Sequence, residues 1–163
     1  MDPPQVPGGG ATLNPFIVVD DAAGFIDFAT QVFEASENAR ARTVLPDGRL
    51  IHAEIELGGS KLLLSERLDG WPAHPGYLQL WVDDAPAVLD RATALDAVVV
   101  TEAVPFYGET TLARMSDPWG NLWWLYAPAP WQEDPRPSWD GGSDVVFRTI
   151  NDEMQARGRP PLT

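Results

Sequence analysis

The spacing of hydrophobic residues changes from a strand-like to a helix-like period near the start of this chain. The short apolar run 16–19 is rich in β-branched residues and predicts a strand. In the next segment the apolar residues recur at the three- and four-residue spacing of one helix face; they are Phe25, Phe28, Ala29, Val32 and Phe33. Between the two segments, Asp20 and Asp21 offer side-chain oxygens that cap a helix N-terminus. The pattern therefore predicts a strand followed by an amphipathic helix.

Three further strands are predicted after this helix, because apolar segments alternate there with residues that favour turns. The predicted strands span residues 39–45, 50–57 and 61–65. The turns that separate them are Pro46-Asp47-Gly48 and Gly58-Gly59. Residues 12–66 thus form a predicted module in which one strand, one helix and three strands follow each other, written βαβββ.

The same order of elements returns 63 residues later. Residues 19–30 and 82–93 are identical at seven of twelve positions. The second copy continues with a helix and with predicted strands at 98–101, 110–115 and 122–126. Two similar helix starts in a chain rich in Ala and Asp are the alternative explanation of this match. We predict an α+β fold built from two βαβββ modules, at 12–66 and 76–129.

Three segments lie outside the two predicted modules. Residues 1–11 are predicted to be a flexible N-terminus, and 67–75 form a linker rich in Pro and Gly. Residues 130–163 are predicted to be a Pro-rich arm followed by a helix from about Asp144 to Arg157. The apolar stripe of this helix is narrow, and it docks either onto its own domain or onto a partner subunit.

Charge and composition exclude several classes of function. The chain has 24 acidic and 11 basic residues and a formal net charge of −13, which argues against binding to nucleic acids or anionic membranes. It has no Cys and only two His, His52 and His74, so thiolate metal sites and disulfides are excluded. There is no signal-peptide pattern and no apolar run long enough to span a membrane. We expect a cytoplasmic protein.

Three segments, together with the paired modules, resemble a known family. They are His52-Ala53-Glu54-Ile55-Glu56-Leu57-Gly58-Gly59-Ser60, Leu62-Leu63-Leu64-Ser65-Glu66 and Asp117-Pro118-Trp119-Gly120-Asn121-Leu122-Trp123-Trp124-Leu125. Over residues 12–129 the chain resembles the vicinal oxygen chelate superfamily of glyoxalase and bleomycin-resistance proteins. It looks most like the branch that includes the phosphonate-operon proteins. The resemblance implies curved mixed sheets around a cleft, and a homodimer.

The resemblance also implies where a metal ion would bind. Enzymes of this superfamily hold a divalent metal with one residue on the first and one on the last strand of each module. Transferred through the repeat, these positions are Asn14, Leu63, Tyr77 and Trp124. The side chains of Leu and Trp offer no lone pair to a cation. We therefore expect no metal and no other cofactor, and neither glyoxalase-type isomerisation nor extradiol cleavage.

Strand alternation from these four positions predicts which side chains share the cleft. The predicted ligand-binding residues are Asn14, Phe16, His52, Glu54, Leu63, Tyr77, Gln79, Trp81, Tyr107, Trp124 and Tyr126. Aromatic rings with a few polar groups suit a flat, partly polar organic ligand. The carboxylates of Glu54 and Glu56 favour a cationic ligand, and Trp faces add cation–π attraction. Some metal-free members of the superfamily sequester antibiotics between two subunits, which the resemblance allows here.

We therefore predict a metal-independent small-molecule-binding protein whose ligand is planar and aromatic or cationic. Two alternatives stay open. A metal-independent enzyme would use Glu54, His52 or Tyr107 as acid or base. In the other alternative the aromatic side chains fill the cavity and the protein is a ligandless structural or interaction dimer. The row His52, Glu54 and Glu56 is more typical of the polar face of a sheet than of an active site.

Overall fold

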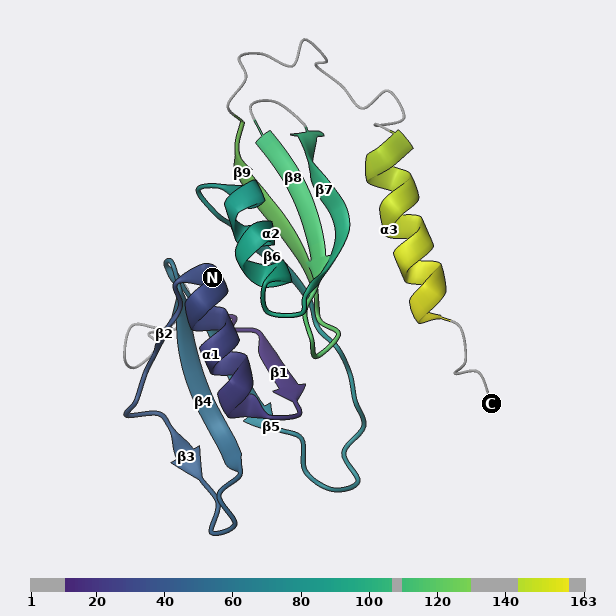
Figure 1. Cartoon of the computed structure of the whole chain (residues 1–163). Helices are drawn as coiled ribbons and strands as arrows, with labels where there is room; N and C mark the ends of the chain where they lie inside the picture. Colours follow the sequence, from purple (N-terminus) through teal and green to yellow (C-terminus); the bar gives the residue numbers. More distant parts are fainter. Residues whose placement is uncertain (1–10, 107–109, 130–143, 159–163) are drawn as a thin grey trace. The chain divides into compact units, whose positions relative to one another are not determined.

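The computed structural model describes residues 11–106, 110–129 and 144–158, which form two compact units that meet in sequence at Gly76 and Tyr77 (Figure 1). The first unit contains β1 (Phe16–Val19), α1 (Ala22–Phe33), β2 (Ser36–Glu37), β3 (Thr43–Val44), β4 (Leu50–Leu57) and β5 (Ser60–Glu66). The second contains β6 (Tyr77–Trp81), α2 (Ala85–Thr93), β7 (Val98–Phe106), β8 (Thr110–Ser116), β9 (Leu122–Pro128) and α3 (Asp144–Arg157). The α+β fold with two βαβββ modules is confirmed.

The sheet of the first unit has the strand order β1-β5-β4-β2, and β3 also pairs with β4. β1 runs parallel to β5, whereas β4 runs antiparallel to it. One face of the sheet packs against α1, which buries Phe25, Phe28 and Val32. The Glu66 carboxylate at the end of β5 accepts hydrogen bonds from the backbone N–H groups of Asp21 and Ala22, at 2.7 and 2.8 Å. This contact ties the start of α1 to the sheet.

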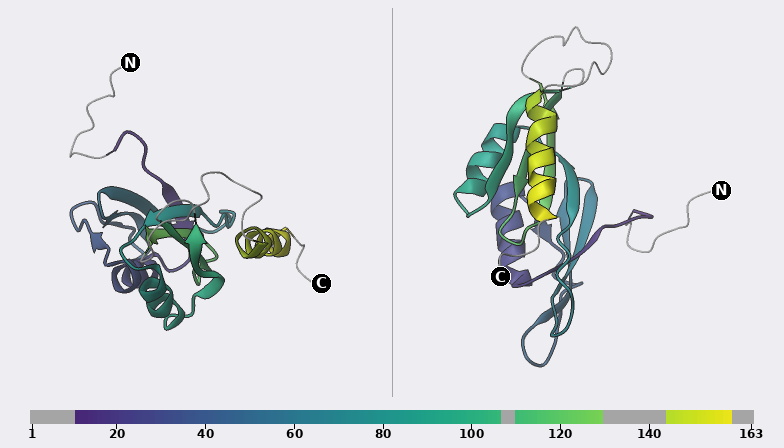
Figure 2. Two further views of the ribbon diagram at one scale, coloured as in Figure 1. Left: turned by 90° about the horizontal axis from the view of Figure 1, so that it is seen from above. Right: turned by 90° about the vertical axis from the view of Figure 1, so that its right-hand side faces the viewer.

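The sheet of the second unit has the order β6-β9-β8-β7, with β6 parallel to β9. α2 packs against one face, and α3 lies beside the edge strand β7 (Figures 1 and 2). As the sequence predicts, an Asp caps each of the first two helices. Asp21 accepts from Gly24 N and Asp84 accepts from Ala87 N, both at 3.0 Å.

Alternation along β8 and β9 separates the two faces of this sheet. Met115 pairs with Trp123 and Ala113 with Leu125, and all four are buried on the α2 side. The next residue in each strand points to the opposite face. The sheet therefore buries one face under α2 and presents a different set of side chains on the other.

Two predicted strands needed correction. The single strand expected at 39–45 is replaced by the short strands β2 and β3, because Asn38 starts a turn in which Ala41 N donates to Asn38 O. The strand expected at 98–101 continues to Phe106 and includes Pro105. Pro105 is tolerated because β7 is an edge strand, where one side of the backbone needs no ladder hydrogen bond.

The buried carboxylate of Asp117 holds the turn that leads into β9. It accepts hydrogen bonds from Trp119 N, Asn121 N, Asn121 Nδ2 and Trp123 Nε1, at 2.8–3.0 Å. Burial raises the pKa of Asp117, while these four hydrogen bonds favour its charged form. Gly120 has a φ of 83°, which side chains rarely adopt. The Asp-Pro-Trp-Gly-Asn-Leu-Trp motif is thus explained by the local structure it forms.

Replacement of this carboxylate should destabilise the protein strongly. In Asp117→Asn one carboxylate oxygen is replaced by an NH2 group. This group cannot accept the two hydrogen bonds that the oxygen accepts now, so two N–H donors lose their partner. We expect the free energy of unfolding to fall by about 2–3 kcal/mol, measured by urea denaturation. Asp90→Asn, an exposed change of the same kind on α2, should stay within about 0.5 kcal/mol of the wild type. Equal effects of the two changes would contradict this account of the turn.

Candidate functional site

In the first unit, the predicted site residues Phe16, Leu63 and Glu54 lie side by side across three strands. Phe16 is opposite Leu63, and Leu63 is opposite Glu54. The rings of Phe16 and His52 are 6.4 Å apart, and His52 Nε2 is 3.7 Å from Glu54 Oε1. Asn14 lies just before β1 and donates from Nδ2 to Ala11 O, while its Oδ1 is buried without a partner.

Glu54 has partners of its own in this group. Its Oε2 accepts hydrogen bonds from Asn38 Nδ2 at 3.2 Å and from Lys61 Nζ at 3.1 Å. These two contacts, the one with Asn38 first, lower the pKa of Glu54 below its ordinary value of 4.5. The carboxylate is therefore charged at neutral pH, and Lys61 compensates its charge locally.

In the second unit, five predicted site residues share the face opposite α2. We call Tyr77, Gln79, Trp81, Trp124 and Tyr126, on β6 and β9, the aromatic face. The rings of Trp81 and Tyr126 are 5.4 Å apart, and those of Tyr77 and Trp124 are 6.1 Å apart. Tyr77 is 56% and Trp81 61% exposed. The neighbouring rings hold each other in place, but much of their area stays open to solvent.

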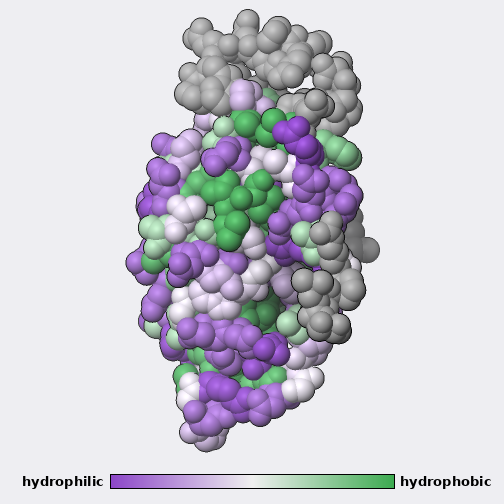
Figure 3. Space-filling view, turned by 45° about the vertical axis from the view of Figure 1, so that its right-hand side comes forward, coloured by the Kyte–Doolittle hydropathy of each residue, from purple (hydrophilic) through white to green (hydrophobic). Residues whose placement is uncertain are grey.

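On the face that Figure 3 draws, hydrophobic patches alternate with hydrophilic ones. Several large apolar or aromatic side chains are exposed in the structure. Those of the second unit are Tyr77, Trp81, Val98, Val145, Phe147 and Met154. Patches of this kind are common on soluble proteins and need support from other observations before they are assigned a role. For Tyr77 and Trp81 that support is their ordered contact with a second ring.

Sequence reasoning missed a further polar residue on this face. Arg114 on β8 lies opposite Trp124, and its guanidinium carbon is 5.6 Å from the centre of the Trp124 ring. The residue is buried, and burial lowers its pKa. A signal was present in the sequence, because Arg114 alternates with the apolar residues Ala113 and Met115 in a predicted strand.

α3 contacts this same face from the β7 side. Arg114 Nη1 donates to Thr101 Oγ1 at 3.1 Å and to the carbonyl of Val146 at 2.9 Å. The hydroxyls of Thr101 and Thr149 are 2.7 Å apart. At the other end, Arg157 Nη1 donates to Gly120 O. The sequence left open what this helix docks onto, and in this structure α3 docks onto the second unit of its own chain.

Two of the four positions expected for the family metal, Leu63 and Trp124, have strand partners that the repeat relates to each other. Phe16 lies opposite Leu63, and the residue 63 positions later, Gln79, lies opposite Trp124. Leu63 and Trp124 therefore occupy equivalent places in the two units, and neither offers a ligand atom. Within the described residues, no three side chains of His, Cys, Asp or Glu lie close enough to bind a metal ion together. Tyr107 lies outside those residues.

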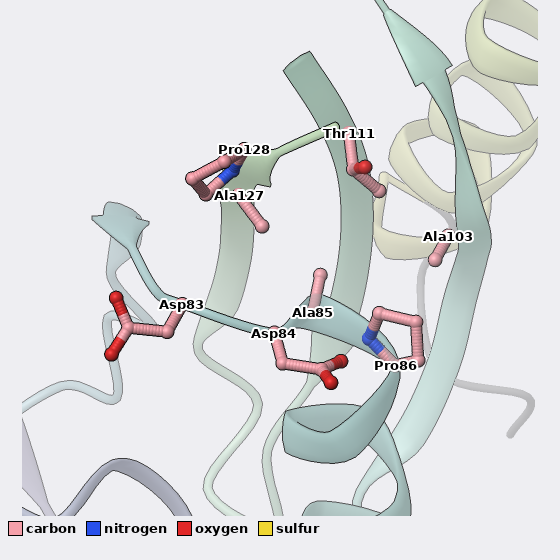
Figure 4. Close-up of a pocket in the computed structure, with 8 residues that line it drawn as sticks. All are labelled: Asp83, Asp84, Ala85, Pro86, Ala103, Thr111, Ala127 and Pro128. Atoms are coloured by element: carbon pink, nitrogen blue, oxygen red, sulfur yellow. The ribbon is translucent and has the colours of Figure 1, made fainter. Parts of the chain in front are cut away.

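A separate pocket of about 300 Å³ opens on the α2 side of the second sheet (Figure 4). Its lining residues are Asp83, Asp84, Ala85, Pro86, Ala103, Thr111, Ala127 and Pro128. Asp84 already caps α2, and Figure 4 shows the Asp83 side chain directed away from Ala103 and Thr111. The pocket thus offers few free polar groups, and none of the predicted site residues lines it.

Comparisons with known proteins agree with this geometry. No family model matches the chain. The uncharacterized protein Rv0887c of Mycobacterium tuberculosis is 33% identical over 130 residues, which cover 71% of this chain and 74% of the relative. The uncharacterized protein Mb0911c of Mycobacterium bovis is also 33% identical over 130 residues, which cover 71% of this chain and 82% of that relative.

Several solved structures have a similar fold. TioX from Micromonospora sp. ML1 matches with a TM-score of 0.55 and 19% identity, over 74% of this chain and 98% of that one. A glyoxalase/bleomycin resistance protein/dioxygenase family enzyme from Burkholderia phytofirmans matches with a TM-score of 0.57 and 19% identity, over 71% and 96%. The fosfomycin resistance protein FosX of Listeria monocytogenes reaches 0.57 at 15% identity, over 72% and 93%. The chain belongs to one family with the two mycobacterial proteins, and its fold is that of the glyoxalase/bleomycin resistance proteins. Among the described residues, no helix is long and apolar enough to cross a membrane.

The Glu54 contacts lead to a pH-dependent prediction. Because its pKa is lowered in the folded state, Glu54 stabilises the protein above pH 4.5, and this contribution is lost as the pH falls through the lowered value. Lys61→Met should raise the pKa of Glu54 towards 4.5, measured by NMR titration of its carboxyl carbon. Arg42→Met, which removes the partner of Glu37 instead, should leave the pKa of Glu54 unchanged. An unchanged value in Lys61→Met would show that the ion pair is not formed in solution.

Proposed function

We propose that this chain is a metal-independent small-molecule-binding protein of the glyoxalase/bleomycin-resistance type that holds a planar aromatic ligand against the aromatic face. The proposal depends mainly on one observation: the rings of Trp81 and Tyr77 are held by neighbouring rings and are also largely exposed to solvent. Each ring contacts a second ring of the same face, yet more than half of each residue is exposed.

Such an arrangement suits a flat ligand for two physical reasons. Covering exposed aromatic area contributes about 25 cal/mol for each Å² of apolar surface removed from water. Ring contacts add about 0.5–1.5 kcal/mol for each well-placed pair. Because the rings on β6 and β9 are already ordered, little side-chain entropy is lost on binding. Gln79, between Tyr77 and Trp81, supplies an exposed amide for hydrogen bonds.

The charges narrow the choice of ligand. A cationic ligand, which the sequence allowed, has less support, because Glu54 already pairs with Lys61 and Asn38. A role of Glu54 as general base has less support for the same reason, since a lowered pKa makes a carboxylate a weaker base. Leu63 and Trp124 at the family's metal positions support binding without a metal.

Two of the similar solved structures are a member of the glyoxalase/bleomycin resistance protein/dioxygenase family and a fosfomycin resistance protein. Sequestration of an antibiotic is therefore a reasonable physiological role to propose for the ligand site. The proposal also includes the homodimer and the cytoplasmic location expected from the sequence.

The proposal is tested by isothermal titration calorimetry with a neutral planar probe, anthraquinone-2-carboxamide. We expect saturable binding that chelators do not change, and a probe recovered unaltered by mass spectrometry. Trp81→Ala should weaken binding about tenfold, which corresponds to roughly 1.4 kcal/mol. Trp71→Ala removes another partly exposed Trp, in the segment between the modules, and should leave the affinity unchanged.

Three results would contradict the proposal. They are the absence of binding by this and other planar probes, equal losses in Trp81→Ala and Trp71→Ala, and binding that requires an added divalent metal.

A further inference from the structure

Arg114 is a buried cation that no described carboxylate pairs with. It is 5% exposed, and it contacts a hydroxyl, a backbone carbonyl and the face of Trp124. The chain has 24 acidic residues and a net charge of −13, so carboxylates are abundant elsewhere. Burying a charge is expensive unless it is paired and hydrogen-bonded. An unpaired guanidinium in such a protein therefore needs an explanation.

One edge of this guanidinium has no partner among the described residues. Nη1 makes both hydrogen bonds, to Thr101 Oγ1 and to the carbonyl of Val146. Nε is fully buried without a partner, and Nη2 forms no hydrogen bond with a described residue. Two adjacent N–H groups on one edge of Arg match both oxygens of a carboxylate, which makes the bidentate pair strong and directional.

Arg114 also lies in the same row of side chains as the aromatic face. Gln79 is opposite Trp124, Trp124 is opposite Arg114, and Arg114 is opposite Thr101. Residues directly opposite each other in neighbouring strands point to the same face of the sheet. The row therefore runs from the exposed amide of Gln79 on β6, past the half-buried ring of Trp124 on β9, to a buried cation on β8.

We propose that Arg114 is the recognition residue for an anionic oxygen group, a carboxylate, carried by the planar ligand of the aromatic face. This inference rests on the proposed function and names the class of ligand, a planar aromatic acid. The ring system covers Trp81 and Tyr126, and the carboxylate pairs with the Nε–Nη2 edge of Arg114. Trp124, which contacts the guanidinium, forms the link between the two parts of the site.

α3 contacts the Arg114 guanidinium at Nη1, outside the Nε–Nη2 edge. The helix supplies the Val146 carbonyl to Nη1, and Val146 is the one buried side chain among the described residues of α3. Polar contacts also join the helix to the sheet, such as that of Arg157 Nη2 with Ser116 Oγ at 2.9 Å. A helix held in this way separates from a sheet at a lower free energy than one held by a wide apolar face.

The experiment compares two matched probes, anthraquinone-2-carboxylate and anthraquinone-2-carboxamide, by calorimetry on the full chain at 0.15 M salt. We expect the carboxylate to bind at least about tenfold more tightly. Long-range electrostatics alone would make the carboxylate bind more weakly than the carboxamide, because a protein with a net charge of −13 repels anions. Equal affinity, or weaker binding of the carboxylate, would overturn the inference and leave the proposed function standing. Binding of neither probe would overturn both.

Variants then test whether Arg114 causes the preference for the carboxylate probe. Arg114→Met should abolish the advantage of the carboxylate while the carboxamide still binds, and Arg114→Lys should recover only part of it. Arg148→Met removes the same charge from an exposed position on α3 and should keep the full preference. A preference retained in a folded Arg114→Met would show that Arg114 only anchors α3, and would overturn the inference. If Arg114→Met does not fold, the order of the two probes on the wild type decides alone.

Discussion

The hydrogen bonds to the Asp117 carboxylate are the constraint on which the second unit depends. They close the turn before β9, and they hold the indole of Trp123 against that turn. The start of β9 then determines its register, in which Trp124 lies between Gln79 and Arg114. A shift by one residue would exchange the two faces of the strand, because side chains alternate with a period of two. The position of the aromatic face is thus a consequence of one buried acid.

The two units have the same strand arrangement, but side chains of opposite charge occupy one equivalent position. Glu54 lies opposite Leu63 in the first unit, and Arg114 lies opposite Trp124 in the second, at equivalent places of the repeat. The carboxylate of Glu54 has Lys61 beside it, whereas the guanidinium of Arg114 has no described counter-ion. The two modules therefore present faces with different chemistry. In one the charge of Glu54 is compensated by Lys61, and the other combines aromatic rings with the buried guanidinium of Arg114.

Much of this architecture could be predicted from the sequence because it depends on local signals. Apolar periodicity and the Asp caps located the first two helices, and the 63-residue repeat predicted the order of elements in the second module. The prediction of a strand at 39–45 was wrong, because the chain turns at Asn38, whose backbone carbonyl accepts a hydrogen bond from Ala41 N. The burial of Arg114 depends on contact with α3, and no local pattern in a sequence reports such a distant contact. The predicted site residues stay a prediction until a ligand is bound.

The most direct test follows the indole N–H signals of the seven Trp residues by NMR while a planar aromatic acid is added. The account predicts that the signals of Trp81 and Trp124 shift in a saturable way and that the presence of a chelator makes no difference. Trp123 donates to Asp117 beneath the opposite face, and its signal should move little. Shifts confined to Trp71, or the absence of any shift at saturating ligand, would contradict the claim that the aromatic face is the binding site.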